Sequence, residues 1–232
     1  MPGDLPQIAS SFGLQIDGII LLIWWLAFGW AFLCEIVLLY AIIAFRKRDG
    51  VRASWMPATK RKALAWIFVP VGLVFVCDIY IDVVSTKVWD EVKIEVPAHD
   101  LLVKITARQF AWDFTYAGED GVLGTDDDFQ SVSEFHVPKD AVVRYQLESK
   151  DVIHSFFVRE LRLKQDALPG RSWPGWFTPT VEGTYEIACT EICGASHTVM
   201  RGELIVHSAE SWLAWSRDLV GQQAQLAQGS EN

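Results

Sequence analysis

Residues 184–200 read TYEIACTEICGASHTVM, and this stretch is the most informative part of the chain for its fold. Its first four residues alternate polar and apolar side chains, as a half-buried β-strand does. A second strand-like segment, 203–207, follows a loop that contains Cys189, Glu191, Cys193, His197 and Met200. We therefore expect a β-domain with a metal-binding loop between its last two strands.

The side chains of this loop, together with the upstream His154, form a soft ligand set. Thiolate and thioether ligands favour Cu(I), while imidazole accepts both oxidation states of copper. Such a set suits an electron carrier. Three alternatives stay open from the residues alone. The cysteines could form a disulfide, one of them could belong to a single-copper site, or the set could bind zinc, which would give Met200 no role.

The loop resembles the copper A loop of subunit II of the haem–copper cytochrome c oxidases. The family pattern C-x-E-x-C-x-x-x-H-x-x-M is filled at every position, and DVIHSF at 151–156 resembles the family segment D-V-x-H-S-F. The resemblance implies two copper ions bridged by the sulfurs of Cys189 and Cys193. It also implies His154 and His197 as ligands of one copper each, and Met200 and the main-chain carbonyl of Glu191 as weak outer ligands. The Glu191 side chain would face subunit I, where the family has a magnesium or manganese site.

Two apolar segments, 19–45 and 63–84, account for much of the 51% hydrophobic content. Each exceeds the roughly 20 residues that cross a bilayer, so we expect a transmembrane hairpin. The loop between them, 46–62, carries seven basic residues and one acidic residue, which predicts that it is cytoplasmic and that both termini are periplasmic. The first 17 residues lack a basic n-region, so we expect the first helix to remain as an anchor.

The predicted domain order follows from these features. We expect an extracytoplasmic segment (1–16), the transmembrane hairpin (17–86), a copper-binding domain (87–207) and a C-terminal helix and tail (208–232). Short strand-like segments such as 101–107, continuing into 108–116, and 141–147 indicate a Greek-key β-sandwich. The resemblance implies the cupredoxin fold for it, so the predicted class is a membrane-anchored all-β protein. Residues 208–225 resemble an amphipathic helix with Trp212, Trp215 and Leu219 on one stripe.

An aromatic segment, QFAWDFTY at 109–116, resembles the family segment Q-W-x-W-x-Y-x-Y. In the family, electrons arrive at the first tryptophan, and Phe110 occupies that position here. By resemblance Phe110 is the candidate site where electrons arrive, but phenylalanine mediates electron transfer less readily than tryptophan. Either Trp112 takes over this role or the donor docks differently. The alternative is that these aromatic side chains only pack within the sheet.

Two further segments have both a functional and a structural interpretation. KQDALPGR at 164–171 resembles K-x-D-A-x-P-G-R, which lies against subunit I in the family, so Asp166 and Arg171 would contact that subunit; a turn held by a salt bridge is the alternative. The acidic, glycine-rich loop 118–128 lacks the EF-hand spacing. It is either a calcium site or a solvated loop that helps to dock the electron donor.

One carboxylate residue, Glu35, lies deep within the first apolar segment. Such residues face protein or water because charge is costly in a bilayer. In the family, a glutamate at the start of the second helix opens a proton pathway, and aligning WIFVP at 66–70 with W-x-x-x-P places Ala63 there. Glu35 either serves that pathway instead or only bonds to a neighbouring helix.

Residues 87–232 contain 13 basic and 23 acidic residues, which argues against nucleic acid as a partner and fits a basic protein donor. The resemblance implies subunit II of a proton-translocating respiratory oxidase in a bacterial inner membrane. It would accept electrons from a separate c-type cytochrome and pass them to haem in subunit I, and would not be catalytic alone. Its partners would be subunit I, other oxidase subunits, the donor and membrane lipid. A membrane-anchored copper-delivery protein and a structural subunit with a vestigial site are the alternatives.

Overall fold

The computed structural model describes residues 5–53, 57 and 59–229. The chain divides into two units: residues 15–90 form one, and residues 1–14 together with 91–232 form the other. The first unit is helical and the second is a β-sandwich.

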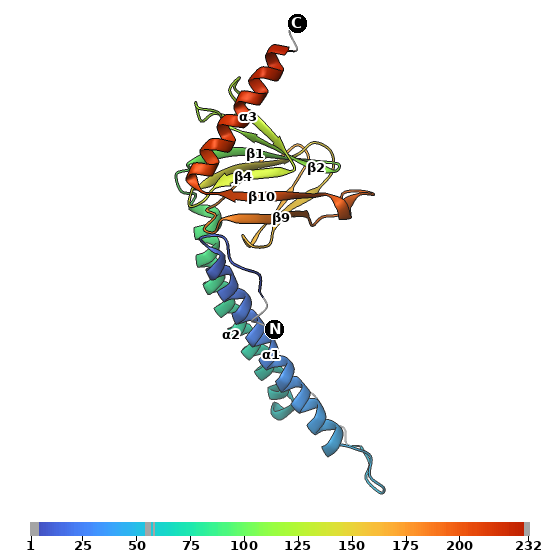
Figure 1. Ribbon diagram of the computed structural model, residues 1–232. Helices are drawn as coiled ribbons and strands as arrows, with labels where there is room; N and C mark the ends of the chain where they lie inside the picture. Colours follow the sequence, from blue (N-terminus) through green and yellow to red (C-terminus); the bar gives the residue numbers. More distant parts are fainter. Residues whose placement is uncertain (1–4, 54–56, 58, 230–232) are drawn as a thin grey trace. The chain divides into compact units, whose positions relative to one another are not determined.

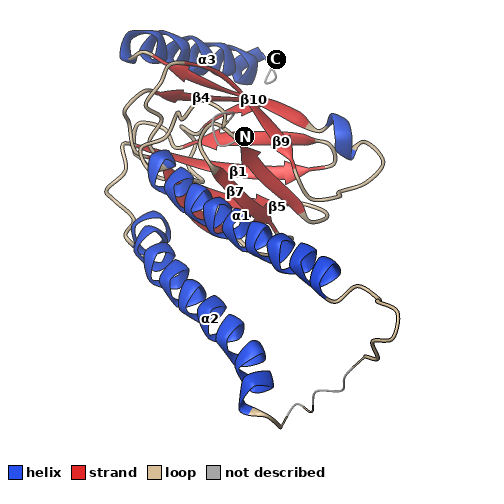
Figure 2. Cartoon of the chain, turned by 90° about the horizontal axis from the view of Figure 1, so that it is seen from below, coloured by secondary structure: helices blue, strands red, loops and turns tan. Residues whose placement is uncertain are grey.

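The helical unit contains two helices that run in opposite directions, α1 (Gly13–Ala44) and α2 (Arg61–Trp89) (Figures 1 and 2). Each is long and apolar enough to cross a membrane. No residue of α2 is buried, so its apolar side chains are free to face lipid or another protein. The predicted pair of apolar helices is confirmed. A π-helical turn, Asp90–Ile94, continues from α2.

The sandwich consists of two five-stranded sheets, with strand orders β3-β2-β1-β5-β8 and β4-β10-β9-β6-β7. Only the pairs β1–β5 and β10–β4 are parallel; the other paired strands are antiparallel. The predicted all-β sandwich is confirmed (Figure 1). Its strands are β1 (Leu101–Arg108), β2 (Ala111–Tyr116), β3 (Phe129–Val132), β4 (Glu134–Pro138), β5 (Val143–Ser149), β6 (His154–Val158), β7 (Leu163–Ala167), β8 (Trp173–Phe177), β9 (Gly183–Cys189) and β10 (Arg201–His207).

The chain reverses direction at residues 109–110, so the predicted continuation of one strand from 101 to 116 is wrong. Strands β1 and β2 form an antiparallel pair in which Arg108 lies opposite Ala111. Alternating apolar side chains occupy odd positions from Val103 to Ala107 and even positions from Phe110 onward. The alternation thus changes phase at Arg108 and Gln109, and this change was the available signal for the turn. The main-chain amide of Gln109 lies outside the β1–β2 strand pairing and donates to the Asp151 carboxylate at 2.6 Å.

Aromatic rings fill the space between the sheets. Phe114 of β2 stacks on Phe135 of β4 with ring centroids 4.6 Å apart, and Phe177 of β8 meets Phe135 edge-on at 5.9 Å. All three side chains are fully buried. They tie the two sheets together, because each contact joins strands of different sheets.

The segment before α1 is bound to the sandwich. The amide of Ala9 donates to the Glu160 carbonyl at 2.9 Å, and the amide of Thr180 donates back to the Ala9 carbonyl at 2.9 Å. The ring of Phe12 is buried and meets Trp176 edge-on at 5.6 Å. Residues 9–12 are therefore attached to the β-domain by main-chain bonds and by an apolar contact.

The C-terminal helix α3 (Ala209–Gly229) packs on β3, β4 and β10 through tryptophans. Trp215 stacks on the imidazole of His136 with centroids 4.0 Å apart. His136 Nδ1 lies 2.8 Å from His207 Nε2, and its Nε2 lies 3.1 Å from a Glu134 carboxylate oxygen. Burial lowers the pKa of both histidines; Glu134 opposes this at His136, and the proximity of His136 adds to it at His207.

This pair predicts that the free energy of unfolding falls as the pH drops below about 6.5, the ordinary histidine pKa. In that range the unfolded chain binds protons that the folded pair does not, so stability is present above pH 6.5 and is lost below it. Urea denaturation of the copper-free chain in detergent, between pH 7.5 and 5, measures the effect. In the double variant His136→Gln, His207→Gln, the free energy of unfolding should depend less on pH. The other titratable groups next to His136, Glu134 and the Tyr116 hydroxyl, are unchanged in this variant. An unchanged pH dependence in that variant would contradict the assignment.

Candidate metal centre

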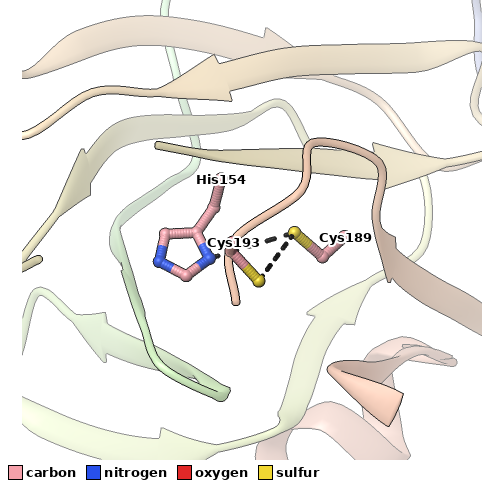
Figure 3. A group of neighbouring side chains, drawn as sticks. All are labelled: His154, Cys189 and Cys193. Atoms are coloured by element: carbon pink, nitrogen blue, oxygen red, sulfur yellow. Dashed lines mark hydrogen bonds between the residues drawn. The ribbon is translucent and has the colours of Figure 1, made fainter. Parts of the chain in front are cut away.

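The pairing of β6 with β9 brings the two halves of the candidate site together. His154 is the first residue of β6 and Cys189 is the last residue of β9. In this antiparallel pair Phe156 lies opposite Cys189, and the amide of Thr190 donates to the Ser155 carbonyl at 3.1 Å. The ladder therefore places His154 beside the start of the metal loop (Figure 3).

The six residues predicted to bind copper lie in one cluster. Cys189 Sγ and Cys193 Sγ are 3.8 Å apart. His154 Nδ1 lies 3.9 Å from the first sulfur, and His197 Nδ1 lies 3.6 Å from the second. The atoms thus follow the order nitrogen, sulfur, sulfur, nitrogen. Two weaker donors complete the set, Glu191 O at 3.2 Å from Cys189 Sγ and Met200 Sδ at 3.7 Å from Cys193 Sγ.

A short 3₁₀ turn, His197–Val199, folds the loop back on itself. The amide of His197 donates to the Gly194 carbonyl at 3.1 Å, and the amide of Met200 donates to the His197 carbonyl at 3.3 Å. The amide of Cys189 closes the loop by donating to the Met200 carbonyl at 3.3 Å. These bonds explain why a histidine and a methionine, four and seven residues after Cys193, both return to its sulfur.

The centre of the cluster is shielded from water. His154, Cys189, Cys193 and Met200 are all buried, whereas His197 is half-buried and Glu191 is exposed. Burial, with the neighbouring Cys189 thiol, raises the pKa of Cys193 to about 11. A metal ion bound here must therefore displace thiol protons as it binds.

The donor set fits copper better than the alternatives. Both cysteines are free thiols, and their sulfur separation of 3.8 Å is far longer than a disulfide bond. Two sulfurs and two imidazoles could bind zinc, but the buried thioether of Met200 beside Cys193 is a soft ligand that zinc sites do not use. A single-copper site would leave one of the two adjacent sulfurs unused. The set thus suggests copper binding.

Asp151, which the sequence analysis did not single out, orients His154. Its Oδ1 lies 2.8 Å from His154 Nε2, which leaves Nδ1 to face the sulfurs. Burial raises the pKa of the Asp151 carboxyl, but hydrogen bonds from His154 and from the amides of Gln109 and Val152 outweigh it and hold the pKa below its usual range. The spacing of an acidic residue three positions before a ligand histidine was the available signal.

Replacing Asp151 by alanine is expected to weaken copper binding by about 10- to 100-fold, because the partner that fixes a ligand histidine is lost. Competition with a copper chelator measures the change. Asp100→Ala is the matched control, since Asp100 also accepts a main-chain hydrogen bond, from the Val142 amide at 2.8 Å, but away from the cluster. Equal copper affinities in the two variants would contradict this role.

Two aromatic residues of the β1–β2 hairpin, Phe110 and Trp112, differ in their exposure to solvent. Phe110 is half-buried at the turn, and its ring lies near Gly194 of the metal loop. Trp112 is completely buried, and its ring centroid lies 6.1 Å from that of His154. Only the first of these rings can therefore touch a docked protein.

Asp166, Arg171 and Glu35 lie outside the cluster. Asp166 and Arg171 are exposed, and among the described residues the structure contains no ion pair between them; Arg171 lies over the Trp173 ring at 5.8 Å instead. Glu35 is exposed on α1. In the loop 118–128, Asp127 accepts hydrogen bonds from the Asp120 amide and the Thr125 hydroxyl, and no metal-ligand cluster includes it in the described part of the chain.

Comparisons with known proteins agree with this architecture. A family model described as "Cytochrome C oxidase subunit II, periplasmic domain" matches residues 101–208. The alternative cytochrome c oxidase subunit 2 of Bradyrhizobium diazoefficiens is 31% identical, in an alignment that covers 90% of this chain and 81% of that protein. Cytochrome c oxidase subunit 2 of Synechocystis sp. is 28% identical, with 92% and 75% covered.

A solved structure extends the similarity to three dimensions. The crystal structure of the periplasmic domain of subunit II of cytochrome oxidase from Bradyrhizobium japonicum matches with a TM-score of 0.50 and 26% identity. The match covers 55% of this chain and 99% of that domain. The β-sandwich described above is thus shared with a domain of that name.

Proposed function

The chain belongs to the cytochrome c oxidase subunit II family, and we propose that it receives electrons from a c-type cytochrome and passes them to haem in subunit I. As a member of this family it is a subunit of the oxidase. The single observation that carries the proposal is the row of His154, Cys189, Cys193 and His197, in which the first three residues are buried, flanked by the buried Met200.

In the proposed site, Cys189 and Cys193 would hold two copper ions through their sulfurs, and His154 and His197 would supply the nitrogen ligands. Met200 Sδ and the Glu191 carbonyl supply the weak outer contacts. Copper bound to such a set supplies one-electron chemistry, because thiolates and imidazoles suit both oxidation states. The protein contributes a ligand frame held by the β6–β9 ladder and the 3₁₀ turn, which limits rearrangement when the charge changes.

The donor side of the proposal rests on charge and on exposed apolar side chains. The acidic balance of residues 87–232 favours a basic cytochrome through electrostatic steering. Ile192 and Val199 of the metal loop are 82% and 71% exposed, which suits an apolar contact at the centre of a transient interface. We propose that electrons arrive at Phe110, and that Trp112 acts behind it, next to His154.

The membrane topology is proposed from two independent features. The basic loop 46–62 is cytoplasmic by its charge. The hydrogen bonds of Ala9 to the sandwich support a position of this residue, which precedes α1, on the same side of the membrane as the β-domain. Both termini and the copper-binding domain are thus periplasmic in a bacterial inner membrane. The proposed domains are 1–16, 17–86, 87–207 and 208–232.

The surface of this chain that would contact subunit I is proposed from its exposed charged residues. The Glu191 side chain is exposed, and it would contribute to a magnesium or manganese site between the subunits. Asp166 and Arg171, exposed and unpaired with each other, would contact subunit I. Glu35 on α1 would either serve the proton pathway or bond to a neighbouring helix, since a carboxylate within a membrane helix faces protein or water.

Stopped-flow mixing tests the function directly. Reduced horse heart cytochrome c, a basic c-type cytochrome, is mixed with the purified oxidase complex before and after copper depletion of this chain. The expected result is fast cytochrome oxidation that depends on copper and slows with added salt. Loss of Cu(I) to an acceptor protein, without any copper-dependent cytochrome oxidation, would favour copper delivery instead.

A further inference from the structure

The turn between β1 and β2 is bonded to both halves of the candidate metal centre. The main-chain amide of Gln109 donates to Asp151 Oδ2 at 2.6 Å. The side-chain Nε2 of Gln109 donates to the Cys193 carbonyl at 2.5 Å. Since the other oxygen of Asp151 lies 2.8 Å from His154 Nε2, one residue connects the histidine loop with the cysteine loop.

The close approach of the turn to the metal loop is also built into the main chain. Gly194 has a φ of +140°, in the region that favours glycine. A Cβ at this position would lie 2.7 Å from Gln109 Nε2 and 3.1 Å from carbons of the Phe110 ring. No side chain separates the two segments, so the position of Cys193 is coupled to that of Gln109.

Among the described residues, Gln109 is the residue of this turn that hydrogen-bonds to both loops. Cys193 follows β9 by four residues and lies outside the strand ladder, so its position depends on contacts of the loop itself. Cys193 is also the ligand closest to both His197 and Met200. A shift of its main chain would therefore move one end of the sulfur pair relative to the other.

We propose that Gln109 is a positioning residue that holds the Cys193 loop in register with the Asp151–His154 pair, an inference that rests on the proposed copper-binding function. Gln109 does not itself bind the metal. Its two hydrogen bonds keep the ligand environments of the two proposed copper positions matched. An electron is shared evenly between two ions only while those environments remain alike.

The test uses the full chain in detergent, loaded with copper. Gln109→Leu removes the side-chain donor, and Gln109→Glu keeps the shape of the side chain but cannot donate to the Cys193 carbonyl. Gln165→Leu is the matched control, because Gln165 is also a glutamine whose side chain is hydrogen-bonded within the β-domain, to Lys93 and Tyr145, away from the cluster. The readouts are the copper hyperfine pattern in electron paramagnetic resonance and the rate of copper release to a Cu(I) chelator.

Both Gln109 variants are expected to release copper about 10- to 100-fold faster and to show an altered hyperfine pattern, whereas Gln165→Leu does neither. A wild-type hyperfine pattern and release rate in the Gln109 variants would overturn the proposal. Equal effects in Gln109→Leu and Gln165→Leu would also overturn it, since they would indicate a general loss of stability. If the wild-type chain binds one copper ion with a localised signal, the proposed function fails, and the relative release rates still decide the role of Gln109.

Discussion

Cys193→Ser is expected to reduce copper binding from two ions to at most one per chain and to abolish any signal from an electron shared between two ions. Cys193 Sγ lies within 3.8 Å of the Cys189 sulfur, the His197 nitrogen and the Met200 sulfur. A serine hydroxyl is a hard, neutral donor and cannot replace a bridging thiolate. Copper-dependent oxidation of cytochrome c should disappear with the signal.

Cys77→Ser is the matched control for this experiment. Cys77 is a free thiol in α2, far along the chain from the metal loop, so its replacement should leave the copper content and the spectrum unchanged. Copper analysis and electron paramagnetic resonance of the two variants provide the comparison. Two copper ions with a shared electron in Cys193→Ser would show that the sulfur bridge is not formed as described.

Trp112→Ala is expected to lower the free energy of unfolding by about 3–5 kcal/mol, the usual cost of truncating a buried large aromatic side chain. Trp112 is fully buried, its ring meets Phe156 edge-on at 5.3 Å, and its centroid lies 6.1 Å from that of His154. The cavity would open between the two sheets, next to a proposed copper ligand. Chemical denaturation of the copper-free chain in detergent measures this change.

Two further variants separate the structural role of Trp112 from a role in electron transfer. Trp173→Ala removes a tryptophan that is 40% exposed and should cost much less stability. Trp112→Phe keeps most of the buried ring, so slower electron uptake in a stable Trp112→Phe protein would support passage of electrons through Trp112. A Trp112→Ala protein as stable as Trp173→Ala would contradict the packing described here.

The features predicted correctly from the sequence are those with short-range patterns. The two apolar helices follow from long runs of apolar residues that contain few charged ones. The spacing of Cys189, Cys193, His197 and Met200 within 12 residues accounts for their clustering, and copper binding by them stays a prediction. The loop is recognisable because a single 3₁₀ turn brings its ligands together, so that sequence spacing determines the geometry.

The features that the sequence did not predict depend on contacts between distant residues. Gln109 and Cys193 are 84 positions apart, and His136 and His207 are 71 apart. The attachment of Ala9 to the sandwich uses main-chain groups, which leave no trace in the residue types. The turn at 109–110 lacks glycine or proline, and in the sequence it is marked by the change of phase in the alternation at Arg108 and Gln109.

Copper content and electron paramagnetic resonance of the copper-loaded full chain test the central claim most directly. The arrangement of His154, Cys189, Cys193 and His197 predicts two copper ions per chain that share one unpaired electron equally. One copper ion per chain with a localised signal would contradict the account.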